Sequence, residues 1–155
     1  MNGVSSLHVV EEITLVTFSK IPSDINFVGD LLTMVSDRQI NIDMISLTNT
    51  HSGFNSLSFT VLDKDLGELL EITAGIKNRY PAIKPLISSG NAKISLFGEE
   101  MRELYGVAAK AISAVSSVGT DIRLITTSEV DISLLIAEAS LLDIIAVLKE
   151  TFSLS

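Results

Sequence analysis

Asn41-Ile42-Asp43-Met44-Ile45-Ser46-Leu47-Thr48 recurs 80 positions later as Asp121-Ile122-Arg123-Leu124-Ile125-Thr126-Thr127-Ser128. Each copy follows a stretch with helical periodicity, and that stretch follows an apolar run typical of a β-strand. A repeat of 80 residues is long enough for a small domain and too long for a solenoid unit. The repeat therefore predicts two copies of one α+β fold, packed together so that they share a cleft.

Composition and charge exclude several classes of function. The chain has 155 residues, of which 46% are hydrophobic, so a buried core is expected in one domain or in two small ones. The net charge of −8 opposes nucleic acid and anionic membrane surfaces, because both are bound through clustered Lys and Arg. With no cysteine in the chain, disulfides, thiolate metal sites and cysteine catalysis are excluded.

The sequence carries no signal for a membrane or for export. The first residues lack a basic segment followed by an apolar core, and no apolar run approaches the roughly 20 residues needed to span a bilayer. We expect a soluble, unprocessed, cytoplasmic chain.

The first copy of the repeat reads as a β-α-β-β-α-β unit. Its predicted elements are a strand at 13–18, a helix at 27–38 with Asp24 as N-cap, a strand at 42–47, a polar turn that includes His51 and Ser52, a strand at 57–61, a helix from Asp63 or Asp65 to Tyr80, and a strand at 83–87. This order is typical of a ferredoxin-like fold, with helices on one face of an antiparallel sheet.

The second copy repeats the order but lacks its last strand. After a polar joint at 88–91, the predicted elements are a strand at 93–97, a loop at 98–104, a helix at 106–118, strands at 122–126 and 130–136, and a helix at 140–152. Residues 2–9 are strand-like and have no partner in the first copy. We expect this N-terminal strand to cross over and complete the second sheet, because an open edge would otherwise stay unpaired; the alternative is a frayed terminus. The expected domains are residues 10–89, and residues 90–155 completed by strand 1–9.

Three motifs resemble those of one known family. The run Leu124–Ser133, LITTSEVDIS, resembles the LI(S/T)TSE(I/V)xIS signature of aspartokinase regulatory regions. Met101-Arg102 followed by Gly106-Val107-Ala108-Ala109 resembles that family's GMRxxPGVAA, and Asn41–Ile45 matches its NIDMI. The whole chain is similar to the tandem ACT-domain region of aspartokinase without the kinase domain. The resemblance implies two ACT units, the second completed by the N-terminal strand.

The resemblance also implies a regulatory function without catalysis. It points to binding of an amino-acid effector, lysine or threonine, for feedback control of aspartokinase, with a homodimer formed through ACT units and an aspartokinase catalytic subunit as a further partner. The sequence departs from the family at Leu47, at Arg123, and at both Pro-Gly positions, where Ile25-Asn26 and Tyr105-Gly106 stand. These departures keep open an alternative, in which the ACT units form a dimerisation scaffold that binds no effector.

A free amino acid needs hydrogen-bond donors for its carboxylate and acceptors for its ammonium group. A loop that runs into a helix supplies free backbone N–H groups, and strand ends supply acceptors. The candidate effector-binding residues are Ser23, Asp24, Ile25, Asn26, Asn41, Ile42 and Asp43 in the first copy, and Met101, Tyr105, Gly106, Val107, Asp121, Ile122, Thr127, Ser128 and Glu129 in the second. Two simpler readings stay open: Asp43 as a solvated charge, and Ser128-Glu129 as a β-turn.

Enzyme and metal sites are not predicted. No P-loop, Gly-x-Ser-x-Gly elbow, His-Glu-x-x-His motif or dinucleotide fingerprint occurs in the sequence. His8 and His51 are far apart and lack neighbouring carboxylates, so neither indicates a metal ligand or a general base. We therefore expect no catalytic residue, no metal and no cofactor.

Overall fold

The structure is a computed structural model, and it describes residues 2–49 and 53–155. It divides into two compact units. The first unit is Glu12–Ser89, and the second unit combines the N-terminal segment up to Glu11 with Gly90–Ser155. The expected turn residues His51 and Ser52 lie outside the described residues.

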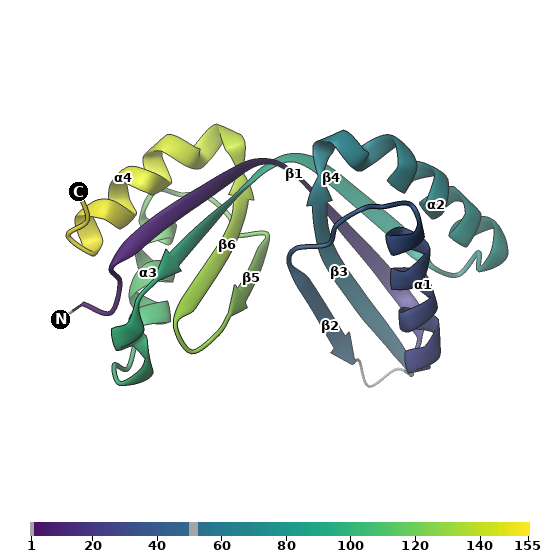
Figure 1. The fold of residues 1–155 in the computed structure, drawn as a ribbon, viewed down its shortest axis with the longest axis horizontal. Coiled ribbons are helices and arrows are strands. Elements are labelled where there is room, and N and C mark those ends of the chain that lie inside the picture. The colour runs from purple at the N-terminus through teal and green to yellow at the C-terminus, as the bar shows by residue number, and fades with distance from the viewer. Residues whose placement is uncertain (1, 50–52) are drawn as a thin grey trace. The chain divides into compact units, whose positions relative to one another are not determined.

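The first unit is a βαββαβ fold (Figure 1). Its elements are β1 (Ser6–Pro22, which begins in the second unit), α1 (Ile25–Asp37), β2 (Ile45–Asn49), β3 (Phe54–Leu62), α2 (Leu66–Arg79) and β4 (Lys84–Phe97, which ends in the second unit). The strand order is β2-β3-β1-β4. Antiparallel pairing brings Val16 and Ile45 to either side of Phe59. The core between sheet and helices is apolar, with Phe18, Phe59, Leu31 and Leu69 almost fully buried.

The second unit repeats this arrangement with a strand borrowed from the N-terminus. It contains α3 (Val107–Ser117), β5 (Leu124–Thr127), β6 (Asp131–Ala137) and α4 (Leu141–Thr151), in the strand order β1-β4-β6-β5. The Ser5 backbone N–H donates to the Phe97 carbonyl oxygen over 2.7 Å, and Val4 belongs to the same apolar core as Leu134 and Phe152. The predicted fold class, with the N-terminal strand completing the second sheet, is confirmed.

Two expected breaks between strands are absent. From Ser6 onward the predicted strands 2–9 and 13–18 form the single strand β1, and from Lys84 onward the predicted strands 83–87 and 93–97 form the single strand β4. The sequence predicts a polar joint at Ser-Ser-Gly-Asn 88–91, whose residue types are common in turns. In the structure Asn91 is fully buried and pairs with Ala137. Gly90 in β4 has a positive φ of 70°, and in β1 Glu12 (58°) and Lys20 (59°) do as well.

Smaller shifts occur at element ends. β2 begins at Ile45 and not at residue 42, although Asp43 N–H and the Met44 carbonyl already bond to the Thr60 backbone. A 3₁₀ turn, Asp63–Asp65, precedes α2, so this helix begins at Leu66. A second 3₁₀ turn, Glu99–Arg102, lies within the expected loop at 98–104.

Within residues 2–49 and 53–155, no helix is long and apolar enough to cross a membrane. The same residues contain no cluster of three or more His, Asp or Glu side chains suited to hold a metal ion.

Candidate functional site

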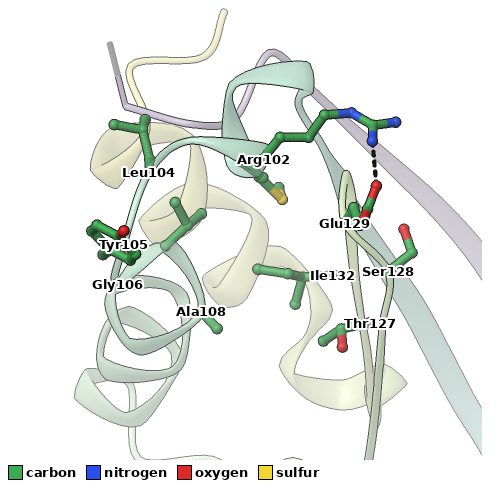
Figure 2. Close-up of a pocket in the computed structure, with 11 residues that line it drawn as sticks. Arg102, Leu104, Tyr105, Gly106, Ala108, Thr127, Ser128, Glu129 and Ile132 are labelled. Atoms are coloured by element: carbon green, nitrogen blue, oxygen red, sulfur yellow. Dashed lines mark hydrogen bonds and ion pairs between the residues drawn. The ribbon is translucent and has the colours of Figure 1, made fainter.

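The second unit contains a hollow of about 480 Å³ between the start of α3 and the turn that joins β5 to β6 (Figure 2). Three segments form its walls: the 3₁₀ turn after β4, the first turn of α3, and the β5–β6 hairpin. Its lining residues are Met101, Arg102, Leu104, Tyr105, Gly106, Val107, Ala108, Thr127, Ser128, Glu129 and Ile132. We call this hollow the α3 pocket.

The start of α3 leaves backbone donors uncovered. Gly106 is the N-cap residue with φ 82°, a left-handed conformation that glycine adopts without a steric penalty. It offers no capping side chain, and the first N–H groups of a helix have no partner within the helix. Val107 is buried and fixes this first turn against the core. Free amides at the positive end of the helix dipole therefore border the α3 pocket and suit an anionic group.

The opposite wall is a tight hairpin turn that carries oxygen atoms. Ser128 N–H donates to the Asp131 carbonyl over 2.9 Å, and Val130 N–H donates to Ser128 Oγ over 3.3 Å. The turn expected as an alternative at Ser128-Glu129 is therefore present, and the same residues also line the pocket. Thr127, Ser128 and Glu129 are all solvent-exposed. A polar ligand can reach their side-chain oxygens from solvent, although Ser128 Oγ already accepts one hydrogen bond.

An ion pair crosses one side of the α3 pocket. Arg102 Nη1 donates to Glu129 Oε2 (Figure 2). Arg102 Nε lies 3.3 Å from Oε2 of Glu99, which is outside the lining residues. All three side chains are at least half exposed, so such pairs contribute about 0–1 kcal/mol and open readily. When the pair opens, the Arg102 guanidinium and the Glu129 carboxylate can each bind a ligand group of opposite charge. Met101 and Ile132 supply an apolar surface between them.

The structure brings seven of the nine candidate residues of the second copy together. Met101, Tyr105, Gly106, Val107, Thr127, Ser128 and Glu129 all line the α3 pocket, although the Tyr105 side chain is fully exposed at its edge. Asp121 and Ile122 do not line it, because they follow the C-terminal end of α3, whereas the pocket lies at its start.

Four lining residues were outside the predicted set. Arg102 carries the ion pair, and Leu104, Ala108 and Ile132 contribute apolar surface. Ala108 was within reach of sequence reasoning, since it directly follows Gly106-Val107 in the motif. Nothing in the sequence indicates that Ile132 reaches the pocket, because it reads as an ordinary inward strand residue.

In the first copy, the candidate residues fall into two separated groups. Ser23–Asn26 are exposed at the start of α1, whereas Asn41–Asp43 precede β2 at the other end of the helix. Pro22, just before the start of α1, pairs with Phe54 on β3. Asp43 instead bonds to Thr60, six residues further along the same strand. Six residues along a strand correspond to about 20 Å. Within the first unit these groups therefore do not meet.

The start of α1 also differs from that of α3 in its cap. Asp24, predicted as the N-cap, accepts a hydrogen bond from Asn26 N–H over 2.9 Å, which confirms that prediction. The Asp24 carboxylate uses one of the N–H groups at the helix start as its hydrogen-bond donor. It also places a negative charge where an anionic group of a ligand would bind. The α3 start is therefore better suited to a carboxylate than the α1 start.

Comparisons with known proteins agree with this fold. The family model of the ACT domain matches residues 94–152. An aspartokinase from Geobacillus stearothermophilus is 30% identical over 145 residues, which cover 94% of this chain and 35% of that protein. A crystal structure of aspartokinase alpha and beta subunits matches with a TM-score of 0.87 at 28% identity, covering 97% of this chain and 99% of the matched chain. This chain has the tandem ACT fold of an aspartokinase regulatory region.

A separate regulatory subunit has the same fold. The ligand-free regulatory subunit of aspartate kinase from Thermus thermophilus matches with a TM-score of 0.87 at 23% identity, covering 97% of this chain and 99% of the subunit. The predicted resemblance, and the prediction of a regulatory rather than a catalytic region, are confirmed. The chain spans about a third of the length of the curated aspartokinases that it matches.

Proposed function

We propose that this ACT-domain chain binds a free amino acid, lysine or threonine, in the α3 pocket and so provides feedback control of an aspartokinase. The observation that carries the proposal is one hollow of about 480 Å³ with an uncapped helix start on one wall and Thr127, Ser128 and Glu129 on the other. The effector carboxylate binds the first amides of α3, and its ammonium group binds Glu129 in place of Arg102.

Regulation then follows from unequal binding. An effector shifts an equilibrium between two conformations only by the difference between its affinities for them. The proposed effector binds better to the conformation in which the α3 start and the β5–β6 turn are closest. The catalytic activity under control belongs to an aspartokinase, either as a separate catalytic subunit or as part of a longer chain. Support comes from the match to a structure of aspartokinase alpha and beta subunits.

Calorimetric titration of the chain with each of the twenty amino acids tests effector binding. We expect heat of binding from lysine or threonine. Glu129→Gln should weaken that binding about tenfold or more, because a charge-assisted contact is lost. Glu103→Gln is the matched control, since Glu103 is exposed nearby but does not line the pocket. No heat from any amino acid at millimolar concentration would instead favour the dimerisation scaffold.

We also propose that the chain forms a homodimer through its first unit. β2 is the last strand in the order of this sheet, and Ile45 and Leu47 on it are 46% and 44% exposed. An edge strand with apolar side chains favours pairing with a second copy. Sedimentation velocity should show a dimer that Leu47→Lys converts to monomer, while Thr48→Lys, on the opposite face of the strand, has a weaker effect. A monomeric unsubstituted chain would contradict this proposal.

A further inference from the structure

A second hollow, of about 240 Å³, lies in the first unit between α1 and α2. Nothing in the sequence motifs assigns it, and it shares no residue with the α3 pocket. Its lining residues are Phe27, Asp30, Leu31 and Met34 from α1, with Gly75, Ile76, Arg79 and Tyr80 from α2 and its C-cap. We call it the α1–α2 hollow.

The helix periodicity explains which side chains face this hollow. On α1 the lining residues recur at spacings of three and four, which place them on one side of the helix. On α2 the hollow is lined by Gly75, which has no side chain. A Cβ atom built on Gly75 would meet no atom within 4 Å, so the space beside this glycine is open.

The walls of the α1–α2 hollow are apolar and well fixed. Leu31 and Ile76 are almost fully buried. Phe27 and Tyr80 pack edge to face, with ring centroids 4.9 Å apart and an interplanar angle of 90°. Met34 is partly exposed and, as an unbranched side chain, adapts to the shape of a ligand. An apolar group of a ligand would be surrounded by these side chains.

The hollow also carries one charge of each sign. The Arg79 guanidinium lies 5.9 Å from the centroid of the Tyr80 ring, and Asp30 is an exposed carboxylate on α1. Within residues 2–49 and 53–155, neither side chain forms an ion pair with the other or with a third residue. A guanidinium suits a carboxylate, and a carboxylate suits an ammonium group.

We propose that the α1–α2 hollow binds a single free amino acid with an apolar side chain, such as leucine, methionine or phenylalanine. Arg79 binds the carboxylate, Asp30 binds the ammonium group, and the side chain packs among Phe27, Leu31 and Ile76. The volume of 240 Å³ is below the roughly 300–1,000 Å³ of sites for drug-sized ligands, which favours a small molecule. This site is independent of the α3 pocket, which we assign to lysine or threonine.

Titration of the full chain with L-leucine, L-methionine and L-phenylalanine at millimolar concentration tests the proposal. We expect at least one of them to bind. The bound amino acid should lose affinity about tenfold or more when its carboxylate or its ammonium group is removed, as in isopentylamine and 4-methylpentanoate for leucine.

Two pairs of variants locate the binding site. Gly75→Leu fills the hollow and should abolish binding, whereas Gly67→Leu on the same helix should not, since a Cβ there also meets nothing within 4 Å but lies outside the hollow. Arg79→Gln should weaken binding about tenfold or more, and Lys77→Gln should leave it unchanged. Circular dichroism checks that each variant is folded.

The proposal is overturned if none of the three amino acids binds, or if binding survives both Gly75→Leu and Arg79→Gln. The lysine and threonine titrations, run on the same variants, separate this result from the assignment of the α3 pocket. For two independent sites, we expect Gly75→Leu to abolish leucine binding and to leave lysine binding unchanged.

Discussion

Gly98 follows β4 at a point where the N-terminal segment leaves no room for a side chain. A Cβ atom on Gly98 would lie 1.8 Å from the Gly3 carbonyl oxygen and 2.7 Å from its carbon. The φ angle of −171° is open to any residue, so the restriction comes from contact and not from backbone conformation. The close approach of Gly3 therefore requires glycine at position 98, beside the hydrogen bond from Ser5 N–H to the Phe97 carbonyl oxygen.

Gly98→Ala is expected to lower the free energy of unfolding by about 2–3 kcal/mol, because the clash is with backbone atoms that cannot rotate away. Urea unfolding followed by circular dichroism measures the change. Gly67→Ala on the exposed side of α2 is the control, with an expected stabilisation of about 0.5–1 kcal/mol. Equal stability of Gly98→Ala and the unsubstituted chain would argue against the observed packing of the N-terminal segment.

At the residue scale, the motifs predicted residues that the structure brings together, while their binding of an effector stays a prediction. Gly106 and the Thr127-Ser128-Glu129 run were predicted together and do line one pocket. Asp121 is a candidate as an acceptor beside a strand end, and its position in the repeat is that of Asn41, yet it lies at the other end of α3. A repeat shows that two segments are equivalent and does not show which end of a unit forms the site.

At the scale of elements, the equivalent helices α1 and α3 start differently, and the difference follows from one residue type in each. The Asp24 side chain caps α1, whereas the N-cap residue of α3, Gly106, has no side chain that could do so. Asp24→Ala is expected to cost about 1 kcal/mol of stability, since Asn26 N–H loses its acceptor. Thermal unfolding measures it, with Asp37→Ala at the other end of α1 as the control. An unchanged melting temperature for Asp24→Ala would mean that the cap does not stabilise the helix.

The strands were harder to predict than the helices. The helices could be predicted from apolar residues spaced three and four apart, because this periodicity is a property of the local sequence. Ser88, Ser89, Gly90 and Asn91 have turn propensities, yet all four lie within β4, where Asn91 pairs with Ala137. Tertiary pairing overrides local propensity here, and single-sequence reasoning has no access to it.

At the scale of the whole molecule, the second unit depends on residues far from it in sequence. Its core includes Val4, which is 5% exposed, and β4 pairs with the N-terminal segment through Ser5 and Phe97. The need for a missing strand was predictable, because the second copy of the repeat ends one strand short. The continuity of β1 through both units was not.

Deletion of residues 1–9 should therefore destabilise the second unit selectively. Loss of Val4 burial alone is expected to cost about 1.5–3 kcal/mol, and the edge of β4 loses its partner. Amide hydrogen exchange should accelerate in β4 from Gly90 onward and in β5, β6, α3 and α4, while α1, α2 and β3 stay protected. Uniform protection after the deletion would show that the N-terminal strand does not complete that sheet.

The most direct test of the proposed effector site is an electron-density map of the chain crystallised with lysine or threonine. We predict density for the amino acid in the α3 pocket, with its carboxylate at the first amides of α3 and its ammonium group at Glu129. An α3 pocket without ligand density, in crystals where the amino acid is bound elsewhere on the chain, would contradict the account.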